Sequence, residues 1–270
     1  MSSSISAGRA PRLRRPTARV HDPRTPLRFI AAIATLLIIS ALPILAGRAL
    51  VQIADIGPAN PPDIAAPVPG TRTLNQPLSL LLAVDASGSM EASDPRGLRY
   101  LDARAVVRWL GDHSENTDDR FGSIHFASNP GLELPPIPVQ GNLPVIDAAL
   151  QKPATDLGGG TNIVGALESI DRLIASTTGT VPVVVILSDG LPNDGDYGAV
   201  GEAIRSLQAN VWLIAFDFDV SYSAQAKPAW DRFAISGTIR LDSLDSGSVA
   251  NAIATIVTVE TGQSWAVSTP

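Results

Sequence analysis

The chain has 270 residues, enough for one or two globular domains, and 45% of them are hydrophobic. It has no cysteine, which excludes disulfides and thiolate zinc sites, and its three histidines are too few for a histidine-rich metal cage. The net charge of −6 is uneven, because residues 1–28 carry seven arginines and one aspartate while the remainder is strongly acidic. An acidic domain is a poor phosphate binder, so we expect no nucleic-acid partner.

An uncharged segment, residues 29–47, follows the basic tail. Its almost wholly apolar run reaches about 27 Å as a helix, close to the thickness of a bilayer core, and predicts a transmembrane helix. The arginines before the span place residues 1–28 in the cytoplasm and everything after Arg48 outside it. The length of the run favours an uncleaved signal anchor. A cleaved signal peptide, with a weak site at Gly47-Arg48-Ala49, remains the alternative, and it exports the same domain.

Residues 48–77 are expected to form a linker between the membrane and the domain. Proline is frequent there, and such a composition favours a semi-rigid, extended spacer. The prolines are Pro58, Pro61, Pro62, Pro67, Pro69 and Pro77.

From residue 78 onwards, predicted strands and helices alternate. Strands are expected at 78–84, 121–126, 181–187 and 211–216, with a weaker one at 238–241 and a proline-rich edge strand or loop at 132–139. Helices are expected at 98–110, 144–150, 163–174, 200–207 and 246–260. This order predicts an α/β fold, a doubly wound and mostly parallel sheet with helices on both faces. A single domain at 78–262 accounts for it, and 263–270 form a C-terminal tail.

Polar side chains follow the apolar strands at the edge where such sheets bind ligands. Asp85, Ser87 and Ser89 come after the strand at 78–84, and Asp189 comes after the strand at 181–187. Thr161 lies just before the helix that begins near residue 163. Two carboxylates and three hydroxyls without imidazole or thiolate suit a hard cation such as Mg²⁺.

The pattern Asp85-x-Ser87-x-Ser89, then Thr161, then Asp189 resembles the metal-ion-dependent adhesion site of von Willebrand factor type A domains. The likeness extends over roughly residues 78–260. It implies that the two serines bind Mg²⁺, or Mn²⁺ or Ca²⁺, directly, and that Thr161 does so directly or through water. It also implies that the two aspartates act mostly through bound waters. The remaining coordination position would take an acidic side chain of a protein partner.

Each of these residues also has a simpler interpretation. Thr161 can be only the N-cap of the following helix, and Asp189 can be only a turn residue. The loop Asn193-Asp194-Gly195-Asp196 lacks the alternating ligands of an EF-hand and is expected to be a solvated turn.

Three ring-bearing residues outside this pattern receive structural interpretations. His125 lies on a predicted strand and is expected to be a hydrogen-bonded core residue. Trp230 and Trp265 lie near the ends of predicted elements, where they can act as surface anchors.

The sequence therefore predicts a bacterial, single-pass membrane protein whose extracytoplasmic domain binds a protein partner through a metal, without catalysis. One alternative is a metal site that only stabilises the domain. A less favoured alternative is a metal-dependent hydrolase. Ser87 is not in a Gly-x-Ser-x-Gly nucleophile elbow, and Arg96 and Arg99 are the nearest cations for holding phosphate.

Overall fold

The structure is a computed structural model. It describes residues 67–69, 72–73, 75–113, 116–153, 157–193, 195–218 and 220–267. The chain divides into two compact units, Met1–Ile56 and Gly57–Pro270, and all described residues belong to the second. The predicted cytoplasmic tail and the predicted span at 29–47 lie outside the described residues. Within the described part, no helix is both long and apolar enough to cross a bilayer.

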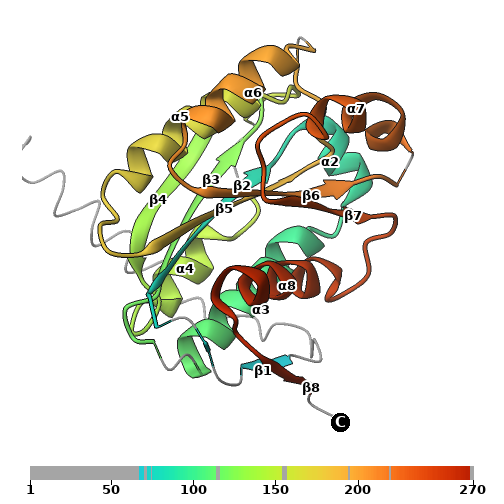
Figure 1. The fold of residues 1–270 in the computed structure, drawn as a ribbon. Coiled ribbons are helices and arrows are strands. Elements are labelled where there is room, and N and C mark those ends of the chain that lie inside the picture. The colour runs from blue at the N-terminus through green and yellow to red at the C-terminus, as the bar shows by residue number, and fades with distance from the viewer. Residues whose placement is uncertain are drawn as a thin grey trace, which may run out of the picture. The chain divides into compact units, whose positions relative to one another are not determined.

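A six-stranded sheet forms the centre of the second unit, with the strand order β4-β3-β2-β5-β6-β7 (Figure 1). All neighbouring strands are parallel except β4, which pairs antiparallel with β3. The prediction of a mostly parallel sheet is thus confirmed. The strands are β2 (Leu78–Asp85), β3 (Arg120–Phe126), β4 (Pro130–Pro138), β5 (Val181–Ser188), β6 (Asn210–Phe216) and β7 (Gly237–Leu241). The proline-rich β4 is at the edge, where proline is tolerated because an N–H that points away from β3 has no strand to bond.

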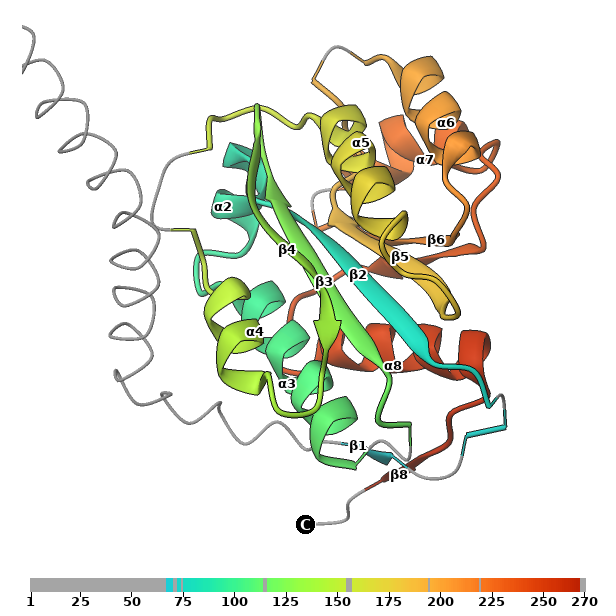
Figure 2. The same cartoon turned by 90° about the vertical axis from the view of Figure 1, so that its left-hand side faces the viewer.

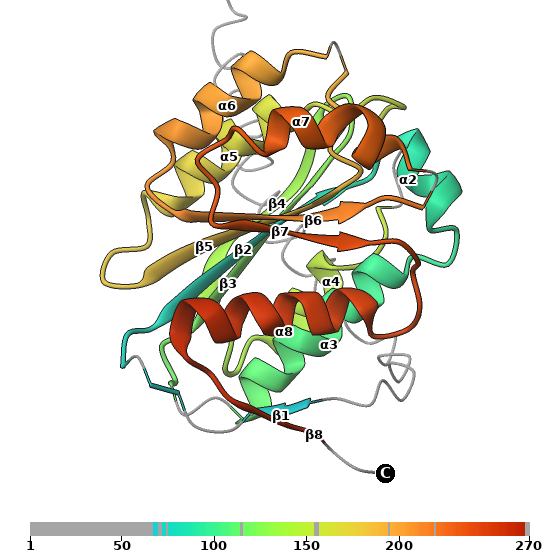
Figure 3. The same cartoon turned by 45° about the vertical axis from the view of Figure 1, so that its right-hand side comes forward.

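Helices cover both faces of this sheet, as Figures 2 and 3 show. One face carries α3 (Leu98–His113), α4 (Leu143–Ala149) and α8 (Ser248–Thr261). The opposite face carries α5 (Ile163–Ile174), α6 (Tyr197–Ser206) and α7 (Lys227–Trp230). The short helix α2 (Gly88–Ser93) lies at the side to which the arrowheads of β6 and β7 point (Figure 3).

The two faces of the sheet enclose two separate apolar cores. Along β2, Leu80 and Leu82 belong to the core beneath α3 and α8, whereas Leu81 belongs to the core beneath α5 and α6. This alternation explains the continuous apolar run, because a strand covered on both faces needs apolar side chains at every position. Each fully buried leucine of this kind contributes about 1.5–3 kcal/mol.

Some elements were not predicted. The six-residue α2 is too short to show a periodic pattern, and a π-helical turn at Tyr222–Ala226 leads directly into α7. The chain also forms a small antiparallel pair between β1 (Pro67–Pro69) and β8 (Trp265–Val267), which lies next to α3, on the side of the helices away from the main sheet (Figure 2).

A buried ion pair lies beside this small sheet. The Arg72 guanidinium donates to both carboxylate oxygens of Asp119 at 2.8 and 2.7 Å, and its Nε donates to Gln263 at 3.2 Å. Asp119 also accepts the backbone N–H of Leu78 at 2.8 Å, where β2 begins. Arg72 therefore ties the segment before β2 both to Asp119, which precedes β3, and to Gln263, which follows the last helix.

Candidate metal centre

The predicted ligands lie at the point where the sheet changes winding direction. β2 pairs with β3 on one side and with β5 on the other, and the helices that follow β2 and β5 cover opposite faces. In open α/β sheets, the crevice at such a point is the usual place for a ligand. Asp85 ends β2 and Asp189 directly follows β5, so both carboxylates lie at this crevice.

Asp85 is completely buried, at 0% exposure, and both of its carboxylate oxygens accept hydrogen bonds. Oδ1 accepts the backbone N–H of Ser87 at 2.8 Å, and Oδ2 accepts the hydroxyl of Ser188 at 2.6 Å. Burial raises the pKa of Asp85 to about 6; the hydrogen bonds oppose this rise, and the nearby Asp189 adds to it. Bringing a positive charge to this carboxylate would be favourable, because its ionised form is poorly compensated.

Three further predicted ligands contact one another. The hydroxyl oxygens of Ser87 and Ser89 are 3.2 Å apart, and Ser89 donates to Asp189 Oδ2 at 2.6 Å. Asp189 is 9% exposed, and its Oδ1 accepts the backbone N–H of Leu191 at 3.2 Å. Ser89 is exposed, so the cluster has one side open to solvent. Asp189 is therefore a turn residue, as the simpler interpretation expected, but it has a second contact as well. One carboxylate oxygen accepts the Leu191 N–H in the turn, and the other accepts the Ser89 hydroxyl.

Thr161 reaches the same region through its loop. The carbonyl of Gly159 accepts the N–H of Gly88 at 3.3 Å, which joins the loop before α5 to the start of α2. Thr161 is 6% exposed; its N–H donates to the Asn193 side chain, and its carbonyl accepts the Asn193 N–H at 3.1 Å. The threonine is thus held between the Gly-rich loop and the loop after β5.

The donor set fits a hard divalent cation. It consists of oxygen only, with two carboxylates and neutral hydroxyls. Among the described residues, neither Asp85 nor Asp189 is in an ion pair, and no group of three or more His, Cys, Asp or Glu side chains could hold a metal. A cation here would therefore depend on the hydroxyls as well as on the two aspartates.

Three supporting residues were not recognised as such from the sequence. Ser188 donates to Asp85 and also accepts the Gly190 N–H at 3.0 Å. Asn193, expected in a solvated turn, binds the backbone of Thr161. Arg99 donates from Nε to the Asp85 carbonyl at 3.0 Å. Asn193 and Arg99 act on backbone atoms, which leave no motif, whereas Ser188 acts on a side chain, and a serine directly before Asp189 at a strand end was a usable signal.

The structure corrects two expectations about helix ends and aromatic anchors. The N-cap of α5 is Asn162, whose side chain accepts the Gly165 N–H at 2.9 Å, and Thr161 therefore does not cap this helix. Trp230 is not a surface anchor, because it is 0% exposed and donates to the Gly190 carbonyl at 2.9 Å. The side chain of Trp265 lies outside the described residues.

His125 is a core residue, as expected, but it is not hydrogen-bonded. It is 1% exposed, and within the described part of the chain neither ring nitrogen has a hydrogen-bond partner. Its ring lies 5.3 Å from that of Tyr100. Burial, reinforced by the charge of Arg99, lowers the pKa of His125 to about 4. A neutral imidazole at physiological pH follows from this environment.

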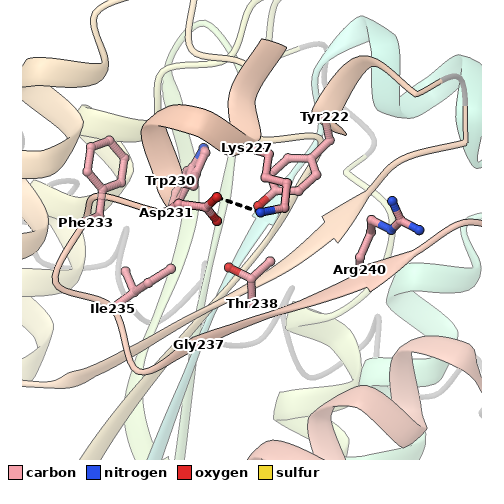
Figure 4. A pocket seen from close by; sticks show the side chains of 9 residues that line it. All are labelled: Tyr222, Lys227, Trp230, Asp231, Phe233, Ile235, Gly237, Thr238 and Arg240. Atoms are coloured by element: carbon pink, nitrogen blue, oxygen red, sulfur yellow. Dashed lines mark hydrogen bonds and ion pairs between the residues drawn. The ribbon is translucent and has the colours of Figure 1, made fainter. Parts of the chain in front are cut away.

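A pocket of about 470 Å³ lies between the α7 region and β7 (Figure 4). None of the five predicted ligands lines it. Its Lys227 and Asp231 pair with each other at 2.6 Å, and Trp230 at its wall is the residue that supports Gly190. The pocket is thus connected to the β5 loop but is separate from the oxygen cluster.

Comparisons with known proteins agree with this fold. The sequence model of the von Willebrand factor type A domain matches residues 80–192. The pilus adhesin SpaC from Lactobacillus rhamnosus GG has a TM-score of 0.57 at 15% identity, over 71% of this chain and 32% of that one. A von Willebrand factor type A protein from Catenulispora acidiphila has a TM-score of 0.52 at 14% identity, over 71% of this chain and 46% of that one.

An aerotolerance-related membrane protein from Bacteroides fragilis is 20% identical, with a TM-score of 0.49, over 67% of this chain and 99% of that one. No curated protein matches the sequence. The family match, together with the α/β architecture, supports a von Willebrand factor type A domain in this part of the chain. At these identities, the structural likeness concerns the fold alone.

Proposed function

We propose that the domain binds a divalent cation through Asp85, Ser87, Ser89, Thr161 and Asp189 and uses it to capture a protein partner. The observation that carries this proposal is the placement of two carboxylates, neither of them in an ion pair among the described residues, at the switch point of the sheet. Ser188 donates to Asp85 and Ser89 donates to Asp189. The ion is Mg²⁺, with Mn²⁺ or Ca²⁺ as substitutes that the same oxygen set accepts.

Each side chain has a distinct role in this proposal. Ser87 and Ser89 offer neutral oxygens, Thr161 offers another directly or through water, and the two aspartates balance the ion's charge and orient the hydroxyls. A bound cation would provide an electrophilic centre that an Asp or Glu side chain of the partner can complete. The partner reaches it from the side of Ser89, because Ser89 is the exposed member of the cluster. No acid–base pair is needed, so the proposed role is binding rather than catalysis.

Neither alternative from the sequence is favoured by an observation of its own. A phosphohydrolase needs a cation to hold phosphate, but Arg99 is fully buried and its guanidinium is engaged with backbone carbonyls. Arg96 is exposed, and within the described part of the chain no hydrogen bond or ion pair directs it to the five predicted ligands. A metal that only stabilises the domain would require no exposed ligand, whereas Ser89 is exposed.

The proposal also includes the location of the domain relative to the cell membrane. Residues 29–47 anchor the chain in the cell membrane, with the N-terminus in the cytoplasm and the domain outside. Alkaline washing of membranes that contain the full chain should leave it in the pellet. A soluble fragment that begins near Leu50 would instead show that the segment is cleaved.

Two measurements on the full-length chain in detergent test the binding role. Calorimetry with Mg²⁺ and Mn²⁺ should show uptake of one ion, and Asp189→Asn should abolish it. Asp171→Asn, at an exposed position on α5, is the matched control and should bind as wild type does. Peptides selected from a random display library in Mg²⁺ and eluted with EDTA should be rich in Asp or Glu. Uptake of metal without any EDTA-eluted peptide would favour the purely stabilising site, and no uptake at all would refute the proposal.

A further inference from the structure

Arg99 is the second residue of α3, and its side chain is completely buried at 0% exposure. Arginine is almost never fully buried unless its charge is paired. Here the partner is Asp94, whose Oδ2 accepts from Nη1 at 2.9 Å. The same carboxylate accepts the backbone N–H of Leu98 at 2.8 Å, at the start of α3.

The rest of the guanidinium is directed at the backbone near the candidate metal centre. Nε donates to the Asp85 carbonyl at 3.0 Å, and Nη1 donates to the Met90 carbonyl at 3.3 Å. Nη2 donates to the hydroxyl of Tyr100 at 3.2 Å. Together with Asp94, these contacts join the start, the middle and the end of residues 85–94.

That stretch contains three of the five proposed ligands, namely Asp85, Ser87 and Ser89. The strand ladder ends at Asp85 and α2 has only six residues, so secondary structure alone holds the stretch weakly. An outer contact to Glu91 at 3.4 Å adds little, because Glu91 is 39% exposed. The buried guanidinium of Arg99 therefore adds a restraint on the spacing of these oxygens, beside the contacts that Asp85 makes with Ser87 and Ser188 and that Ser89 makes with Asp189.

We propose that Arg99 is a positioning residue for the metal site, an inference that rests on the proposed function. It holds residues 85–94 in the arrangement that a cation needs before the cation arrives. It touches neither the ion nor the partner and acts through the backbone carbonyls of Asp85 and Met90.

An effect of Arg99 through its charge and an effect through positioning predict opposite changes in metal affinity when the residue is replaced. A guanidinium near the site repels a cation, so if only its charge mattered, Arg99→Met would tighten metal binding. If position matters, Arg99→Met and Arg99→Lys should both weaken binding, because lysine keeps the charge but lacks the planar fork of donors. Arg99→Lys also keeps a positive charge beside Asp94, which makes it the variant expected to fold.

The test is Mn²⁺ calorimetry on the full-length chain in detergent, well below the melting temperature of every variant. Both Arg99 variants should bind Mn²⁺ about 10- to 100-fold more weakly, as is usual when the partners of metal ligands are removed. Leu110→Ala is the matched control, because Leu110 is buried on the same helix at the end away from the site. It should lower the melting temperature and leave the Mn²⁺ affinity within about twofold.

Hydrogen exchange in EDTA gives a second readout that needs no metal. The amides of Ser87, Gly88 and Glu91 should exchange at least about tenfold faster in the Arg99 variants than in Leu110→Ala. Unchanged or tighter Mn²⁺ binding in Arg99→Met, or exchange that only follows global stability, overturns the inference. If wild type takes up no Mn²⁺, the proposed function fails, and the exchange result still decides whether Arg99 holds the stretch.

Discussion

Two buried titratable side chains lie in or next to the candidate site. Burial raises the pKa of the acid, Asp85, to about 6 and lowers the pKa of the base, His125, to about 4, because burial disfavours the charged form of each. Both residues flank the same part of the sheet, since Val84 is the register partner of His125 and Asp85 is that of Phe126. Their effects on stability can be separated by pH.

Asp85 should make the metal-free protein less stable as the pH rises. A carboxyl whose pKa is raised from 3.8 to about 6 stabilises the folded state below the unfolded pKa, and this contribution is lost as the pH rises through about 6. Asp85→Asn in EDTA at pH 7.5 should therefore be more stable than wild type, by up to about 3 kcal/mol in urea unfolding. The difference should vanish at pH 4. A less stable variant at pH 7.5 would contradict this.

His125 should act in the other direction. A histidine whose pKa is lowered from 6.5 to about 4 contributes stability above pH 6.5 that is lost as the pH falls towards 4. His125→Leu replaces the ring with an apolar side chain of similar volume and removes up to about 3 kcal/mol of this acid sensitivity. The measurement is urea unfolding at pH 7.5 and at pH 4.5. If wild type and variant lose the same stability between pH 7.5 and pH 4.5, His125 is not responsible for the acid sensitivity.

At the scale of elements, the small β1–β8 sheet and the Arg72–Asp119 pair connect the segment before β2 to the segment after α8. Both side chains of the pair are nearly inaccessible, at 5% and 2% exposure. In this setting the loss of one partner is costly, because the other charge remains buried. Residues 67–69 and Arg72 therefore contribute to the stability of the domain, although the prolines of this part of the chain are typical of a linker.

Asp119→Ala should destabilise the chain by about 3–5 kcal/mol in urea unfolding, because Arg72 loses its carboxylate and Leu78 loses an acceptor. Asp119→Asn keeps one acceptor and should cost less. Arg72→Met combined with Asp119→Leu should also cost less than Asp119→Ala, since it leaves no buried charge behind. Equal losses in all three would indicate that only shape matters at this position.

The elements also differ in how well sequence pattern predicts them. The long strands and α5 have strong apolar periodicity and are where the pattern places them. The turn at Tyr222–Ala226 and α7 were missed, because their order depends on Trp230 packing under Gly190 rather than on a local period. Gly190 has a φ of +73°, and a Cβ there would lie 2.9 Å from Trp230 Nε1. This close approach arises from the tertiary structure, and the residues around Trp230 in the sequence do not indicate it.

For the whole molecule, metal binding and folding should be linked. If only the folded chain binds the ion, Mg²⁺ at 100 times its dissociation constant should add about 2.7 kcal/mol to the free energy of unfolding. The melting temperature of the full chain should therefore rise with Mg²⁺ and fall with EDTA, whereas that of Asp189→Asn should not respond. A Mg²⁺ response in Asp189→Asn equal to that of wild type would place the ion elsewhere.

The sequence by itself predicted the α/β class and the mostly parallel sheet, which the structure confirms. It also predicted Asp85, Ser87, Ser89, Thr161 and Asp189 as a set of oxygen ligands, which stays a prediction. Local periodicity and the position of polar residues at strand ends are sufficient for these predictions, because both can be recognised from residues that are neighbours in the sequence. Only the tertiary structure decided that Ser188 bonds to Asp85, that Arg99 spans residues 85–94 and that Trp230 supports Gly190. All three contacts join segments that are distant in the sequence, and those of Arg99 and Trp230 end on backbone carbonyls, which are the same in every residue. Local periodicity therefore does not mark them.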